Sequence, residues 1–83
     1  MMVTRETMKD WVIAALKYHG GKAWPKDVAQ YIWENYEAKL RLSGSMLWTW
    51  QYDARWAAQI LRNEGILKPV NRRTDLPWEL VNQ

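Results

Sequence analysis

The first hydrophobic pattern in the chain lies between residues 8 and 16. Five apolar side chains recur there every three or four positions: Met8, Trp11, Val12, Ala15 and Leu16. This spacing is that of one buried face of an α-helix. Thr4 or Thr7 can cap the first turn, and the pair Gly20-Gly21 can end the helix in a left-handed conformation. We therefore expect a first helix that ends before Gly20.

A second apolar stripe follows after a short gap. Its members share one helical face: Val28, Ala29, Ile32, Tyr36 and Leu40. Pro25 is tolerated in a first helical turn, and Asp27 suits the positive end of the helix dipole. We expect a second helix that begins near Pro25, preceded by about three extended residues around Ala23.

A third helix is expected after a loop. Residues 41–50, RLSGSMLWTW, contain a Ser-Gly-Ser turn and no clear period, so we expect a loop in which Thr49 caps the next helix. That helix should run from about Trp50 to Asn63 or Glu64, with Gly65 as its left-handed end. Helical spacing places four apolar residues on the core side: Trp56, Ala57, Ile60 and Leu61. The opposite, solvent-exposed side should carry Gln51, Arg55, Ala58, Gln59 and Arg62.

The C-terminal part predicts a β-hairpin, which we call the wing (residues 66–80). Two short apolar segments, ILKPV and PWELV, are joined by NRRTDL. Pro69 cannot donate to a strand ladder, so its segment should lie at a sheet edge. A two-stranded hairpin is not stable alone in water, so Trp78 and Leu80 are expected to pack against the helices.

The order of these elements predicts the fold class. Helix, short strand, helix, helix and hairpin is the order of a winged helix-turn-helix. We therefore predict an α+β, mainly α domain with three helices and a small β-wing over residues 4–81. Eighty-three residues are enough for one such domain and too few for two.

Composition narrows the class of protein. Nearly half of the residues are hydrophobic, at 48%, and they include seven tryptophans, which is typical of a globular chain with bulky core residues. The chain has no cysteine, which excludes disulfides and thiolate zinc sites. No apolar run approaches the roughly 20 residues of a membrane span. We expect a cytoplasmic protein without a membrane partner.

Basic residues are concentrated in one part of the chain. Residues 1–54 carry seven basic and six acidic side chains, a net charge of +1. Residues 55–73 carry five basic side chains against Glu64 alone, a net charge of +4. Because the third helix and the wing share this positive segment, we expect duplex DNA as the partner.

Each predicted DNA-binding residue has an expected role. Side chains on the third helix should face base edges: Gln51, Arg55 and Gln59. Basic side chains at the end of that helix and on the wing should face phosphates: Arg62, Lys68, Arg72 and Arg73. The expected function is that of a small regulator or accessory module, acting as a homodimer or with a larger effector protein.

Two tryptophans leave an alternative function open. Trp48 and Trp50 lie at the entry to the third helix, where an exposed indole can stack on a base or pack on a partner protein. The alternative is therefore a winged helix that uses the Trp48/Trp50 surface for protein association.

Nothing in the sequence predicts catalysis. His19 is the one histidine and lies at the end of the first helix, where an imidazolium suits the dipole. The spacing of Asp and Glu residues suggests no metal site. We expect no enzymatic activity, no metal and no cofactor.

Asp53 lies within the apolar stripe of the third helix, so it either caps the helix N-terminus or meets a basic residue of the first or second helix. We favour the helix end.

The third helix and the wing resemble the N-terminal winged-helix domain of Mrr-type restriction endonucleases and related modification-dependent systems. That family has the pattern Arg-x-x-Trp-Ala-x-x-x-Leu-x-x-x-Gly-Leu-Leu, followed by a Gly-x-Trp-x-Leu/Ile-Thr strand. The matching residues here are Trp56, Ala57, Leu61, Gly65, Ile66, Leu67, Trp78 and Leu80. Asp53 stands at the arginine of the pattern, and the segment ELVNQ lacks the family's threonine and closing glycine. The resemblance is specific from about residue 53 to residue 80 and implies a DNA-binding accessory domain related to restriction-modification. No cleavage activity is implied.

Overall fold

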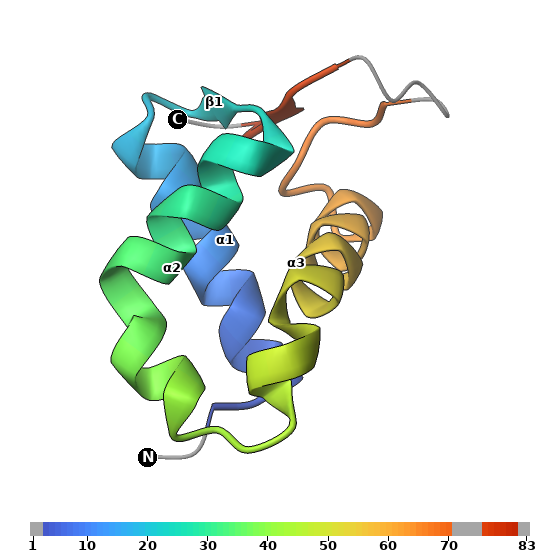
Figure 1. Cartoon of the computed structure of the whole chain (residues 1–83). Coiled ribbons are helices and arrows are strands. Elements are labelled where there is room, and N and C mark those ends of the chain that lie inside the picture. Colours follow the sequence, from blue (N-terminus) through green and yellow to red (C-terminus); the bar gives the residue numbers. More distant parts are fainter. Residues whose placement is uncertain (1–2, 71–75, 82–83) are drawn as a thin grey trace.

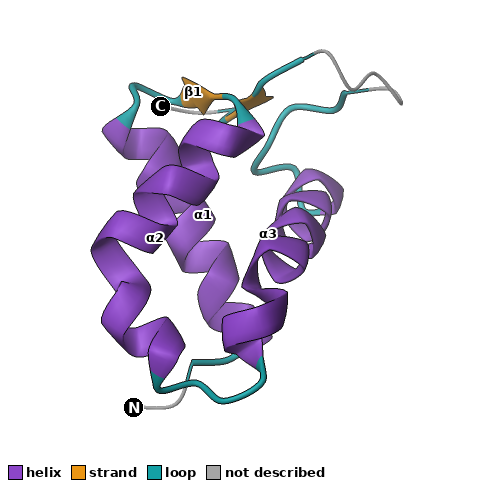
Figure 2. Cartoon of the chain, in the orientation of Figure 1, coloured by secondary structure: helices purple, strands orange, loops and turns teal. Residues whose placement is uncertain are grey.

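Three helices and a small antiparallel sheet form the structure (Figure 1). It is a computed structural model that describes residues 3–70 and 76–81. The elements are α1 (Arg5–Tyr18), β1 (Lys22–Ala23), α2 (Pro25–Arg41), α3 (Met46–Asn63) and β2 (Trp78–Glu79). Figure 2 shows the sheet at one end of the helices and the α2–α3 connection at the other. The predicted α+β, mainly helical class is confirmed.

The ends of α1 agree with the sequence. Thr4 is the N-cap: its side chain accepts a hydrogen bond of 3.2 Å from the backbone N–H of Thr7, whose hydroxyl accepts one from the N–H of Thr4. Gly20 follows the helix with a φ of 84°, a conformation that glycine adopts without strain. The five predicted core residues of α1 are all buried.

The predicted stripe of α2 also faces the core. Val28, Ile32 and Leu40 are buried, and Ala29 and Tyr36 are half-buried against them. The Tyr36 ring stacks on Trp11 of α1 with 4.2 Å between ring centroids. An extended strand, β1, precedes α2 as expected.

Helix α3 begins a full turn before the predicted start. The loop that precedes it is therefore shorter than expected. Thr49 does not cap the helix but lies inside its first turn. The N-cap is Ser45, whose side chain makes no capping bond. Met46 and Leu47 are half-buried, and Met46 packs against the core, so tertiary packing stabilises this first turn without a local capping signal.

The buried stripe of α3 is rotated from the prediction. Its members are Trp50, Asp53, Ala54, Ala57, Ala58 and Leu61. Ala58, predicted on the exposed face, is fully buried, whereas Trp56 and Ile60, predicted in the core, are only half-buried. The cause is that α3 packs against both α1 and α2, and three alanines let the helices approach closely.

The C-terminal strand lies between two neighbours. On one side β2 pairs with β1, with Ala23 opposite Trp78. On the other side Leu67 bridges Leu80, and the N–H of Lys68 donates to the carbonyl of Glu79 at 2.8 Å. The base of the predicted hairpin is therefore confirmed, and residues 66–68 form its outer segment next to Pro69.

Two further predictions for this region are confirmed. Trp78 and Leu80 are buried in the core, as expected for a hairpin that needs support from helices. Gly65, with a φ of 78°, follows α3 as its left-handed end. In the part of the chain that the structure describes, no helix is both long and apolar enough to cross a membrane.

Candidate nucleic-acid interface

The solvent-exposed side of α3 is the candidate interface, and we call it the outer face. It is formed by six exposed side chains: Trp48, Gln51, Tyr52, Arg55, Gln59 and Asn63. Helical spacing places them along one side of the helix, opposite the buried stripe. The structure thus leaves all three predicted base-contacting residues in solvent on one helix.

The charge of the outer face depends on where Asp53 points. Asp53 is the one acidic residue of α3, Met46–Asn63, and it is 6% exposed. Its Oδ1 lies 3.2 Å from Nε of Arg5 on α1, and its Oδ2 accepts a hydrogen bond of 2.9 Å from the hydroxyl of Thr49. The charges that α3 still exposes are therefore those of Arg55 and, in part, Arg62.

The favoured prediction for Asp53 was wrong. It is not a cap at the helix end, because α3 begins seven residues earlier, at Met46. The alternative, a basic partner on the first helix, is what the structure shows. Arg5 also covers Trp56, with 4.7 Å between its guanidinium carbon and the ring centroid. Trp56 is half-buried: it packs against the core and also lies beneath the guanidinium of Arg5.

Arg62, predicted to face phosphate, is half-buried rather than free in solvent. Its Nη1 donates to Oε1 of Gln59 at 3.1 Å, and its guanidinium lies 5.9 Å from the Trp78 ring centroid. Its Nε is buried without a hydrogen-bond partner, and burial lowers the pKa of the guanidinium below its ordinary value. Arg62 thus adds charge at the edge of the outer face and holds Gln59 in place.

Of the predicted phosphate-contacting residues on the wing, Lys68 lies within the described part of the chain. Lys68 is exposed, and its Nζ lies 3.0 Å from Oε2 of Glu79, so part of its charge is neutralised within the sheet. Arg72 and Arg73 lie outside the described residues. Their expected phosphate contacts stay predictions from the sequence.

The two tryptophans before the middle of α3 have different environments. Trp48 is 84% exposed. Trp50 is 7% exposed and stacks on Trp33 of α2, with 5.9 Å between centroids, so it belongs to the core and does not offer the exposed indole that the alternative function needs. Both indoles border a groove of about 520 Å³ between α2 and α3, which also contains Lys26.

Sequence analysis missed Lys26. It is exposed in the first turn of α2 and borders the groove, and with Gln51 and Arg55 it also borders a smaller hollow of about 200 Å³. A signal was available, because a cation in the first turn of a helix opposes the helix dipole and gains nothing locally. Such a residue is a candidate for an external anionic partner.

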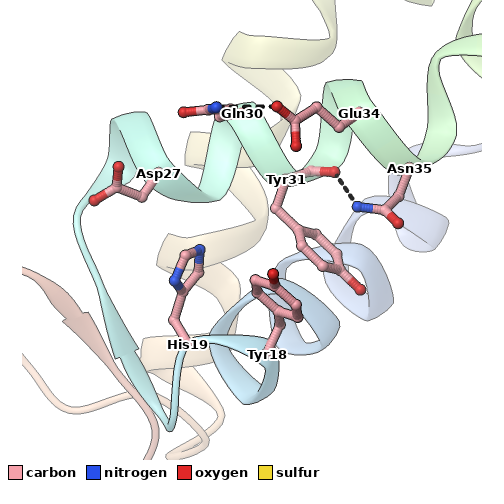
Figure 3. Close-up of a pocket in the computed structure, with 7 residues that line it drawn as sticks. All are labelled: Tyr18, His19, Asp27, Gln30, Tyr31, Glu34 and Asn35. Atoms are coloured by element: carbon pink, nitrogen blue, oxygen red, sulfur yellow. Dashed lines mark hydrogen bonds between the residues drawn. The ribbon is translucent and has the colours of Figure 1, made fainter.

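A second hollow, of about 470 Å³, lies between the end of α1 and α2 (Figure 3). Asp27 and Glu34 lie at separate places along α2, and the His19 ring lies on the side of Asp27. Glu34 already accepts a hydrogen bond of 2.9 Å from Gln30. Tyr18, Tyr31 and Asn35 also line this acidic hollow. Among residues 3–70 and 76–81, no group of three or more His, Cys, Asp or Glu side chains could hold a metal ion.

Comparison with known proteins returns no match among protein-family models, curated proteins or solved structures. The resemblance to Mrr-type winged-helix domains therefore stays a prediction from the sequence.

Proposed function

We propose that this chain is a winged-helix module that binds duplex DNA through the outer face of α3 and the wing. One observation carries the proposal: the single carboxylate of α3 is buried against Arg5, so the charges left on the surface of the helix are those of Arg55 and, in part, Arg62. A negative side chain on this face would repel phosphates. Because the carboxylate of Asp53 lies in the core, Arg55 can contact DNA without a negative charge beside it.

The order of elements supports the winged-helix interpretation. Helices α2 and α3 are joined by a connection of four residues, 42–45, and α3 is followed by the paired base of the wing. An exposed helix of this kind fits the major groove of B-DNA. There the side-chain chemistry of Arg55 suits guanine and that of Gln51 or Gln59 suits adenine, while Arg62, Lys68, Arg72 and Arg73 would meet phosphates.

The size of the interface limits its affinity. A single module of this kind buries roughly 600 to 1,000 Å² of protein surface on DNA. For generic sequence we expect a dissociation constant of roughly 10⁻⁴ to 10⁻⁶ M near physiological salt. Tight binding then requires a homodimer or attachment to a larger effector protein, which is the role of an accessory domain.

Amide chemical shifts of the ¹⁵N-labelled protein, titrated with a mixed-sequence duplex at low salt, test the proposal. We expect the largest changes at Gln51, Arg55 and Gln59 and small changes around Tyr31, which borders the acidic hollow on the α1–α2 side. The proposal fails if no amide shifts, or if the changes centre on the Tyr31 side.

A second candidate function rests on exposed apolar side chains. Leu42 is 88% exposed and Trp48 84% exposed, both near the α2–α3 connection. Aromatic residues are enriched in protein interfaces, so this end of the molecule also suits protein association. Binding driven by Trp48 would change little with salt, whereas binding to phosphates weakens steeply as salt rises.

A further inference from the structure

The groove between α2 and α3 has aromatic walls, and we call it the tryptophan groove. Trp33 and Trp50 stack with an interplanar angle of 13° and are held by the core. Trp48 stands at the border of the groove and is 84% exposed. The groove volume of about 520 Å³ lies within the range of roughly 300 to 1,000 Å³ that is typical of small-molecule sites.

The charged residues that border the tryptophan groove are both cations. They are Lys26 at the start of α2 and Arg41 at its end, and no carboxylate borders the groove. Arg41 is paired with Glu37 at 2.7 Å, but Lys26 makes no ion pair with any residue that the structure describes. The groove therefore suits a ligand that combines a flat ring with negative charge.

We propose that the tryptophan groove binds an unpaired nucleobase of the DNA that the outer face of α3 holds. The base stacks on the indole of Trp48, and its phosphate lies near Lys26. The amide of Gln51 offers a donor and an acceptor to the base edge. This inference rests on the proposed function, because the duplex part of the same DNA must lie on the outer face.

The groove is continuous with the outer face. Gln51 borders both the tryptophan groove and the smaller hollow that contains Arg55, and so does Lys26. A strand that leaves a duplex beside Arg55 would thus meet the groove within one turn of α3. The protein should therefore prefer a duplex with an unpaired end or gap to a fully paired duplex.

The composition of the groove favours a nucleotide over a protein segment. Four of its nine bordering residues are charged or carry an amide, Lys26, Gln30, Arg41 and Gln51. The central part of a protein interface is depleted of charged residues, lysine among them. Stacking on an indole with a lysine nearby is instead the usual arrangement for single-stranded nucleic acid.

Two DNAs test the inference by fluorescence anisotropy: a blunt 16-base-pair duplex, and the same duplex with a four-thymine 3′ or 5′ overhang. We expect the wild-type protein to bind one overhang duplex about fivefold or more tightly than the blunt duplex, the effect of stacking one base. Trp48→Ala should bring the ratio of overhang-duplex to blunt-duplex affinity to about one, whatever its effect on blunt-duplex binding itself. Leu42→Ala is the matched control, since Leu42 is equally exposed but does not border the groove.

Each result of these titrations either supports the inference or overturns it. Loss of the preference in Trp48→Ala but not in Leu42→Ala supports the inference. The inference is overturned if the wild-type protein binds the blunt duplex and both overhang duplexes equally. The proposed function then stands, and a protein partner is the alternative occupant of the groove. A preference that survives Trp48→Ala also overturns the inference. If the wild-type protein binds none of these DNAs, the proposed function fails and the inference fails with it.

Discussion

The inner and outer faces of α3 both carry tryptophan and charged side chains, but these side chains have opposite environments on the two faces. On the inner face Trp50 stacks in the core and the charge of Asp53 is compensated by Arg5. On the outer face Trp48 is in solvent, and Arg55 makes no ion pair with any residue that the structure describes. The inner groups stabilise the fold, whereas the outer groups gain nothing from folding. The stabilising contacts thus lie on the inner face, and the outer face is the proposed binding surface.

The largest expected effect compares the two tryptophans of α3. Trp50→Ala should lower the free energy of unfolding by about 3 to 5 kcal/mol, because it empties a buried site. Trp48→Ala should change it by no more than about 0.5 kcal/mol, because the indole is exposed. Denaturant melts of both variants measure the two values. Similar losses in both would contradict the division of α3 into two faces.

The next effect concerns the pair of Arg5 and Asp53. Arg5→Met should cost about 2 to 3 kcal/mol, because it leaves a buried carboxylate with only the hydroxyl of Thr49. Asp53→Ala should cost less, about 1 to 2 kcal/mol, because the released guanidinium is half-exposed and turns to water. Denaturant melts of the two single variants and the double variant give the coupling. A larger loss for Asp53→Ala than for Arg5→Met would show that the carboxylate is not desolvated as described.

Local patterns predicted much of the fold. The stripes of α1 and α2 were correct because their apolar residues follow a single helical period and because Thr4, Pro25 and Gly20 mark the ends. The order of elements and the burial of Trp78 also followed from the sequence. The stripes and their ends depend on residues that are close in the chain, whereas the burial of Trp78 followed from the general need of a two-stranded hairpin for support.

The errors all lie where distant segments meet. The start of α3 has no capping side chain, so only packing against the other helices shows that Met46 is helical. Ala58 is buried because α3 packs against two helices at once, which a single helical wheel does not show. Asp53 meets Arg5 across 48 positions of the chain, and no local pattern gives such a pair. At the candidate site, the exposure of Gln51, Arg55 and Gln59 was predictable from helical spacing.

The third prediction concerns Arg55 on the outer face. Arg55→Ala should weaken binding to a mixed-sequence duplex by about five- to tenfold, because one charge-assisted contact is lost. Its unfolding free energy should stay within about 0.5 kcal/mol of the wild type. Lys39→Ala removes the same charge beside Tyr36, on the α1–α2 side, and is the matched control. Equal weakening by Arg55→Ala and Lys39→Ala in anisotropy titrations would mean that only net charge matters.

The smallest expected effect lies at Arg62, between the two faces. Arg62→Met keeps the packing on Trp78 and removes a guanidinium whose Nε is buried without a partner. Stability should therefore change by less than about 1 kcal/mol in thermal or denaturant melts. A loss well above that value would place Arg62 among the residues that hold the core.

The salt dependence of duplex binding tests the central claim most directly, because phosphate contacts release counterions. For a blunt 16-base-pair duplex, the logarithm of the association constant should fall linearly with the logarithm of salt concentration. The expected slope is about −0.9 per phosphate contact, or about −3.6 if Arg62, Lys68, Arg72 and Arg73 each make one. Replacing Arg72 and Arg73 together by alanine should flatten the slope by about two units. No measurable binding at low salt, or binding that does not change with salt, would contradict the account.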